Sequence, residues 1–167
     1  MRIIDAPDDL PVTVKELAEQ LHFDEADAMV FDQLIAAATD VIETATNHPI
    51  QPRVVEIDLP EGCWSEFWLP CAPAIELVGV TSGRLVRPFN EPRFIREDYV
   101  GDTLQVRVGH ADPRTIPDRL RRAIILLVKE WHASDITVEE AYTRPSLSFG
   151  FHQIMRQSRY RRPCEVR

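Results

Sequence analysis

Apolar residues recur at steps of three and four positions in several stretches of the chain, which is the spacing of an amphipathic helix. Thr13 and Glu16 stand at capping-box spacing at the start of the first stretch. Pro49 ends the second stretch, because the residue before a proline avoids helical geometry. A second capping-box pattern, TVEE, opens the last stretch. The pattern predicts helices over residues 13–21, 25–47, 117–134 and 137–143.

Between residues 50 and 110 the hydrophobic period changes to two, which is typical of half-buried strands separated by turn-forming residues. The predicted strands cover residues 53–60, 65–70, 74–82, 92–97 and 103–110. We therefore predict an α+β fold that is mainly α, in which long amphipathic helices pack together around a small inserted antiparallel β-sheet. This domain spans residues 1–143, with the β insertion over 50–110, and a basic C-terminal arm follows over 144–167.

The predicted helix over 117–134 carries the clearest pattern. Its broad apolar stripe, which includes Trp131, predicts a buried core helix. Arg119, Arg121 and Arg122 lie at its N-terminal end, where positive charge opposes the helix dipole. Such a cluster indicates an acidic partner, either within the chain or on a neighbouring subunit, and ordinary surface charge is the alternative. We predict that these three arginines lie at a subunit interface.

Charge is unevenly distributed along the 167 residues, whose formal net charge is −8. Residues 1–70 contain 15 acidic and 3 basic residues, whereas residues 144–167 contain six arginines and one acid. An acidic body with a basic tail indicates a tail that docks on a negative partner, although a solvated terminus is equally consistent with the composition. No apolar run is long enough to span a membrane, and the acidic N-terminus does not resemble a signal peptide.

Candidate chemistry is sparse in this sequence. His132 and Asp135 lie three residues apart on one predicted helix, but a catalytic triad also requires a nucleophile and an oxyanion hole. Phosphate-binding loops, paired-carboxylate motifs and clusters of metal ligands are missing from the sequence. Cys63, Cys71 and Cys164 are expected to be free thiols, with a Cys63–Cys71 bridge as the alternative. We therefore predict a protein that is not an enzyme, with no catalytic residue, cofactor or metal.

The order of the elements resembles the head–tail connector family, also called adaptor or head-completion proteins, of tailed double-stranded DNA phages and gene transfer agents. Three stretches carry the resemblance, and together they cover about half of the chain. They are VTVKELAEQLHFDEADAMVFDQLIAAATDVIETATNHPI (12–50), LPCAPAIELVGV (69–80) and VRVGHADPRTIPDRLRRAIILLVKEWHAS (106–134). The third stretch is the most specific, because a valine-rich strand, a glycine, a short loop and an Ile-Pro pair lead into a hydrophobic helix.

The resemblance implies a structural subunit of a virion or phage-like particle, assembled in the cytoplasm of a bacterial host. Such subunits form a homo-oligomeric ring of about a dozen copies under the capsid portal. The ring extends the DNA channel and joins the head to a downstream neck, stopper or tail protein. DNA is expected to pass through without sequence-specific binding, because an acidic lining repels phosphate.

The basic arm is expected to dock on the portal, with apolar side chains as anchors and arginines as charge. The predicted docking residues are Phe151, Ile154, Met155, Arg156, Arg159, Tyr160, Arg161 and Arg162. The alternative function is a small packaging accessory that binds nucleic acid through the same basic tail.

Overall fold

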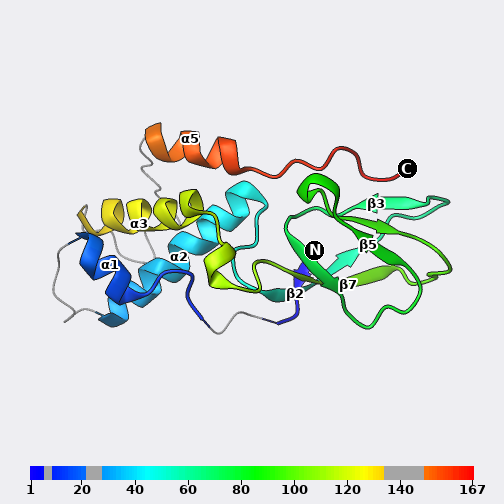
Figure 1. Ribbon diagram of the computed structural model, residues 1–167, viewed down its shortest axis with the longest axis horizontal. Helices are drawn as coiled ribbons and strands as arrows, with labels where there is room; N and C mark the ends of the chain where they lie inside the picture. The colour runs from blue at the N-terminus through cyan, green and yellow to red at the C-terminus, as the bar shows by residue number, and fades with distance from the viewer. Residues whose placement is uncertain (6–8, 22–27, 134–148) are drawn as a thin grey trace. The chain divides into compact units, whose positions relative to one another are not determined.

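The computed structural model describes residues 1–5, 9–21, 28–133 and 149–167, and these residues form two compact units (Figure 1). The β unit comprises the described residues of Met1–Asp8, Asn47–Pro113 and Tyr160–Arg167. The helical unit comprises those of Asp9–Thr46 and Arg114–Arg159. The helix predicted over 137–143 lies outside the described residues.

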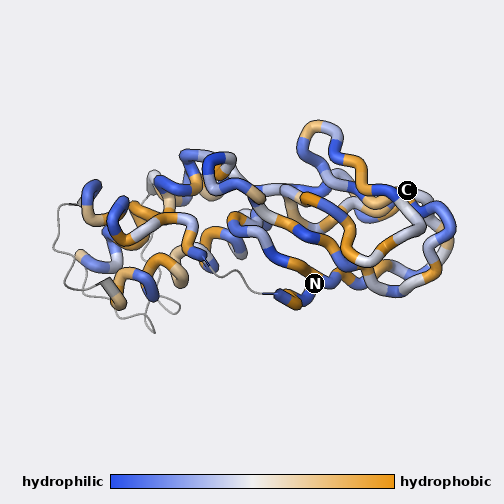
Figure 2. The backbone as a smooth tube through the Cα atoms, turned by 60° about the horizontal axis from the view of Figure 1, so that its bottom comes forward, coloured by the Kyte–Doolittle hydropathy of each residue, from blue (hydrophilic) through white to orange (hydrophobic). Residues whose placement is uncertain are grey.

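The helical unit is built on two central helices, α2 (Ala28–Thr46) and α3 (Asp118–Ala133), which pack against each other. Helix α1 (Val14–Leu21) packs on α2, and helix α5 (Phe149–Ser158) packs on both α2 and α3. Apolar stripes at helical spacing bring these elements together, and Figure 2 shows hydrophobic and hydrophilic positions interleaved along them. The buried apolar residues of this unit include Leu17, Phe31, Leu34, Ile35, Ala38, Ile42, Leu120, Ile124, Leu127, Val128, Trp131 and Phe151.

The first helix begins as its sequence predicts, although its capping differs in part. The backbone N–H of Glu16 donates to the Thr13 side-chain oxygen at 3.2 Å, which satisfies one of the unpaired donors of the first turn. The Glu16 carboxylate accepts hydrogen bonds from Arg121. The side chain that a capping box would turn back onto Thr13 therefore joins α1 to α3.

The β unit contains two antiparallel sheets. The four-stranded sheet has the order β1-β2-β7-β4, and the three-stranded sheet has the order β3-β6-β5. The strands of the first sheet are β1 (Arg2–Ile3), β2 (Arg53–Asp58), β7 (Thr103–Val108) and β4 (Ala74–Leu77). Those of the second are β3 (Glu66–Trp68), β6 (Arg93–Ile95) and β5 (Arg84–Val86).

The β unit has its own hydrophobic core. Alternation places Val55 and Ile57 of β2 in this core, while Asp58 at the strand end is exposed. The other core residues include Phe67, Leu69, Phe94, Leu104, Val106 and Val108. Trp64 and Tyr99 pack around the Phe94 ring with centroid distances of 6.3 and 5.5 Å, in edge-to-face geometry. This core gives the β unit an apolar interior independent of the helices.

The predicted fold class is therefore wrong in its emphasis. The described residues form an α+β fold, with about 40% helix and 20% strand, and not a mainly α fold in which long helices pack together with one small sheet. The prediction found five of the strands but missed β1 and β5, which contain only two and three residues. Because these short strands carry no readable alternation, one sheet was expected where the described residues form two.

Gly109 allows close backbone approach at the end of β7. Its φ of +97° is a conformation that side-chain-bearing residues rarely adopt. A Cβ atom at this position would lie 2.1 Å from the Gln51 carbonyl oxygen. The next residue, His110, donates its backbone N–H to Ile50 at 3.1 Å. Gly109, which belongs to the stretch 106–134 that carries the family resemblance, thus allows the end of β7 to lie alongside the segment that follows α2.

Candidate assembly surfaces

The N-terminal half of α3 presents three arginines in different environments. Pro117 precedes the helix and its carbonyl accepts the Leu120 N–H at 2.8 Å, as expected for a proline at a helix start. One Arg121 nitrogen contacts both Glu16 carboxylate oxygens, at 2.7 and 2.6 Å. Arg119 and Arg122 are exposed. Arg121 therefore has an acidic partner within the chain, and a place at a subunit interface stays a prediction for all three arginines.

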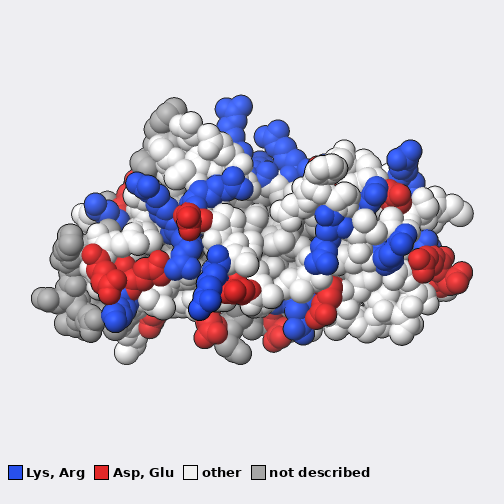
Figure 3. Space-filling view, viewed as in Figure 1, with Lys and Arg blue, Asp and Glu red and all other residues white. Residues whose placement is uncertain are grey.

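Beside this ion pair lies an open cavity of about 420 Å³ between α1 and α3. Its aliphatic wall consists of Ile125, which is buried, and Leu126, which is 38% exposed. Two exposed cations, Arg122 and Lys129, stand among the lining residues. Figure 3 shows acidic and basic side chains interspersed over the helical elements on this face. The lining also includes Asp118 and the paired Glu16 and Arg121, so the aliphatic wall stands among charges of both signs. Such a surface suits the side chain of a partner more than a nucleophilic reaction.

Helix α5 lies where part of the basic arm was predicted, and it contributes to the core of the helical unit. Phe151 is 1% exposed and Met155 is 7% exposed, because α5 packs on α2 and α3. Ile154 is half-buried, whereas Arg156 and Arg159 are exposed. The buried apolar residues expected to anchor a partner therefore stabilise the chain itself, and docking stays a prediction for Arg156 and for Arg159, which directly follows the helix.

Residues 160–167 belong to the β unit, where the last three extend the second sheet. The backbone N–H groups of Ser65 and Glu66 donate to the Arg167 carbonyl at 2.8 and 3.1 Å. Arg167 in turn donates to Glu66 at 2.9 Å, and Trp68 donates to Glu165 at 3.0 Å. The C-terminal residues therefore cover the edge of β3, which would otherwise present unpaired backbone groups.

The remaining predicted docking residues of this segment have different partners. Tyr160 is half-buried, and burial, with Glu91 as the next cause, raises the pKa of its phenol to about 12. Arg162 forms an ion pair with Glu165 at 3.1 Å, and Arg161 is exposed. The four predicted docking arginines are therefore all exposed, and the ion pair with Glu165 distinguishes Arg162 from Arg156, Arg159 and Arg161.

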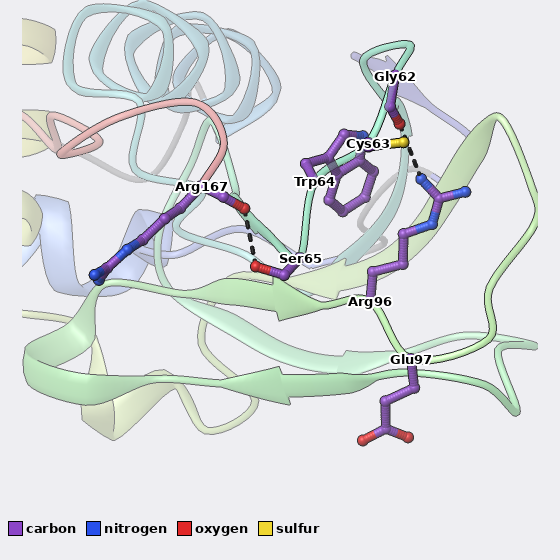
Figure 4. Close-up of a pocket in the computed structure, with 7 residues that line it drawn as sticks. All are labelled: Gly62, Cys63, Trp64, Ser65, Arg96, Glu97 and Arg167. Carbon is purple, nitrogen blue, oxygen red and sulfur yellow. Dashed lines mark hydrogen bonds between the residues drawn. The ribbon is translucent and has the colours of Figure 1, made fainter.

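A second cavity, of about 580 Å³, opens beside the covered edge of β3 (Figure 4). The Arg96 guanidinium stacks over the Trp64 ring at 4.9 Å and donates to the carbonyls of Tyr99 and Gly62 at 2.9 and 3.4 Å. The Ser65 hydroxyl donates to the Arg167 carbonyl at 3.0 Å. Through these contacts Arg96 and Ser65 hold the loop and the C-terminal residues in place.

The histidines do not form a catalytic set within the described residues. The exposed His132 ring packs against Phe31 with a centroid distance of 5.1 Å, and Asp135 lies outside the described residues. His48 and His110 stack in the β unit, with 3.0 Å between their Nε2 atoms, and burial lowers the pKa of His110. Among residues that the structure describes, no three His, Cys, Asp or Glu side chains gather closely enough to hold a metal ion.

Two further expectations from the sequence concern free cysteine thiols and helices that could span a membrane. Cys63, Cys71 and Cys164 are thiols, and the Cys71 sulfur contacts the Met1 sulfur at 3.8 Å. The described part of the chain contains no helix that is both long and apolar enough to cross a membrane.

Sequence reasoning missed one feature of the surface, the turn between β5 and β6. Phe89 is 97% exposed there, and both Phe89 and Asn90 have positive φ angles. The Asn residue in RPFNEP, next to two prolines, was the available turn signal. The sequence gives no sign that the neighbouring phenylalanine would be almost fully exposed, because an aromatic residue usually indicates a core position.

No family model matches this sequence, and no curated protein matches it. Solved structures do share its fold. One chain of the neck of an empty gene transfer agent particle, computed with C6 symmetry, aligns with a TM-score of 0.71 at 17% identity, over 98% of each chain. A chain of the native particle's neck, computed with C12 symmetry, aligns with a TM-score of 0.70 at 20% identity over the same shares.

A third solved structure, the virion of the native gene transfer agent particle, contains a chain that aligns with a TM-score of 0.65 at 20% identity. This alignment covers 97% of the present chain and 98% of the other. The chain therefore has the fold of proteins found in the neck of gene transfer agent particles, which confirms at the level of the fold the resemblance that the sequence predicted.

Proposed function

We propose that this protein is a structural subunit of the neck of a phage-like or gene transfer agent particle, located at its head–tail interface. The observation that carries the proposal is the fold likeness to gene transfer agent neck chains over 98% of both chains. A likeness of this extent includes the helical unit, the β unit and the C-terminal strand together. The role is structural and non-enzymatic.

Within that role we infer a ring that docks on the portal and leads to a downstream neck, stopper or tail protein. Cyclic rings require two different surfaces on each subunit, so that one surface meets the other on the next copy. The exposed Arg119 and Arg122 of α3 are our candidates for one of these surfaces. The acidic composition of the chain supports a channel that DNA passes without adhering, because like charges repel phosphate.

We assign portal docking to the exposed arginines Arg156, Arg159 and Arg161. Deleting the whole segment is a poor test, because Phe151 and Met155 belong to the helical core. Replacing the three arginines with Gln keeps the fold and removes the charge. Co-sedimentation with the cognate portal should fall at least about tenfold, and Arg84→Gln, an exposed arginine in β5, serves as the control.

The docking assignment is contradicted if the triple variant binds the portal as the unaltered chain does. The proposed function itself is contradicted if the unaltered chain neither binds the portal nor forms a ring on it. Circular dichroism of the triple variant, expected to match that of the unaltered chain, separates lost docking from lost folding.

The same three arginines support a second candidate function, a packaging accessory that binds nucleic acid through the tail. In that case the affinity for duplex DNA depends steeply on salt, with a slope proportional to the number of phosphates neutralised. The triple Gln variant would lower that slope by roughly 2 to 3 units, whereas Arg84→Gln would not. Salt-insensitive or absent DNA binding by the unaltered chain would reject this candidate.

A further inference from the structure

Phe89 is the most exposed large hydrophobic residue among those that the structure describes, at 97%. It lies in the turn η2 (Pro88–Asn90), in the connection between β5 and β6. The Glu91 N–H donates to the Pro88 carbonyl at 2.8 Å and closes a turn whose central residues, Phe89 and Asn90, have φ angles of 51° and 63°. Both central positions therefore adopt the left-handed conformation, which is the geometry of a type I′ turn.

Nothing in the fold of the β unit accounts for a phenylalanine at this position. Left-handed backbone geometry favours Asn, Asp and Gly, and it strains a bulky aromatic residue. The ring is almost entirely exposed, so burial within the chain does not compensate for that strain. Backbone strain that a fold retains is concentrated at functional sites, and the exposed phenyl ring is the group that this position offers to another molecule.

The cavity between α1 and α3 has the properties that such a ring requires. Its volume of about 420 Å³ accommodates a phenyl side chain, and Leu126 supplies aliphatic surface that is still 38% exposed. The exposed Arg122 and Lys129 are placed to lie over an aromatic face, which cations favour. Glu91 follows directly after the turn and adds an acidic side chain to it.

We propose that the Phe89 turn of one copy inserts into the α1–α3 cavity of the next copy. The inference rests on the proposed ring and specifies one of its contacts. The turn belongs to the β unit and the cavity to the helical unit, so the two surfaces differ. Contacts between different surfaces repeat head to tail and close a ring when the rotation allows. A second copy is the favoured occupant because every subunit carries both the exposed aromatic turn and a cavity with an exposed aliphatic side chain and two exposed cations.

Photo-cross-linking on the full chain bound to its cognate portal tests this contact. The photoreactive p-benzoylphenylalanine replaces Phe89, so the aromatic character of the side chain is retained. We expect cross-links between two copies that map by mass spectrometry to the segment containing Ile125, Leu126 and Lys129. The same amino acid at Val100, which is 85% exposed in another loop of the β unit, is the matched control and should not give these cross-links.

Several outcomes overturn the inference. A ring that forms on the portal while Phe89 cross-links to another protein, to another part of the chain, or to nothing removes this contact and leaves the proposed function standing. If the unaltered chain forms no ring on the portal, the proposed function fails, and the inference fails with it. Equal labelling of the cavity from positions 89 and 100 also contradicts the inference.

The variant Phe89→Asn gives a second, independent readout. Asn tolerates the left-handed conformation, so the isolated variant should melt about 2–4 °C higher than the unaltered chain. Its assembly on the portal should nevertheless weaken at least about tenfold, because the ring is lost from the contact. Higher stability with weaker assembly supports the inference, and unchanged assembly contradicts it.

The cavity side is tested with Leu126→Glu, which places an acid beside the aliphatic wall. This variant keeps its own Phe89 turn, and Phe89→Asn keeps its own cavity. In a mixture, the intact turn of Leu126→Glu can enter the intact cavity of Phe89→Asn, so heterodimers should form and should not grow further. Neither variant alone should pair. Equal behaviour of the mixture and the single variants contradicts a head-to-tail contact between these surfaces.

Discussion

Trp131 is the largest side chain that the described residues bury completely, and it lies in the last turn of α3. His132, which the sequence offered as a catalytic candidate, is the next residue at this helix end. Trp131 packs inward, and His132 lies exposed against Phe31. Successive side chains of a helix point about 100° apart, so the Trp131 ring is buried while the ring of the next residue, His132, is exposed.

Replacing Trp131 with Ala should lower the free energy of unfolding by about 3–5 kcal/mol, because the substitution leaves a cavity in a packed core. Trp131→Phe is the matched control. Within the described residues the indole N–H has no hydrogen-bond partner, so its removal costs little, and we expect a loss below about 1.5 kcal/mol. Urea denaturation followed by circular dichroism measures both values. Equal costs for the two variants would contradict a packing role.

His110 makes the β unit sensitive to pH. Burial lowers its folded pKa below the ordinary value of 6.5, so the unfolded chain binds its proton at a higher pH than the folded chain does. Stability from this group is present above pH 6.5 and is lost as the pH falls below that value. In addition, the 3.0 Å contact between the Nε2 atoms of His48 and His110 requires one nitrogen to accept.

Urea midpoints measured between pH 7.5 and 5 should therefore fall more steeply for the unaltered chain than for His110→Gln, which lacks the titrating group. The comparison between the two proteins cancels the contribution of the carboxylates. Parallel curves for the two proteins would show that His110 does not contribute to this pH dependence.

At the scale of elements, the bidentate contact between Glu16 and Arg121 joins α1 to α3. Both side chains are less than one third exposed, at 29% and 26%. A double-mutant cycle with Glu16→Gln and Arg121→Gln should give a coupling free energy of about 1 kcal/mol, which falls as salt is added. Arg122→Gln paired with Glu16→Gln is the matched control and should give no coupling. A coupling free energy near zero between Glu16 and Arg121 would show that their contact does not stabilise the fold.

The elements also show how far hydrophobic pattern predicts structure. Helices α1 and α3 begin one residue after their predicted starts, because capping residues and apolar spacing are local signals. The pairing of the C-terminal residues with β3 depends on contacts between positions about 100 residues apart, and residues 165–167 carry no local signal for it. The same limit applies to β5 and to the exposed Phe89.

The arginine cluster illustrates the same point for the candidate surfaces. Its position against the helix dipole correctly indicated an acidic partner for Arg121, but it did not identify Glu16 as that partner. The apolar residues of the predicted arm were recognised as anchors, yet the pattern cannot say whether an amphipathic segment packs on its own chain. The structure assigns Phe151 and Met155 to the core of the helical unit.

For the whole molecule, two units connect through four passages of the chain. A sequence pattern read from one end to the other places the β residues as an insertion between helices. The described residues at both termini belong to the same β unit as the central strands. This unit has its own hydrophobic core, as a folding domain does. The fold is shared with gene transfer agent neck chains at an identity of 17–20%, so few of the structurally aligned residues are identical in type.

Cryo-electron microscopy of the full chain bound to its cognate portal shows whether this protein is, as we propose, a ring-forming subunit of a particle neck. We expect a closed ring of copies on the portal, with the Phe89 turn of each copy against the α1–α3 cavity of its neighbour. A chain that stays monomeric and leaves the portal bare at saturating concentration would contradict it.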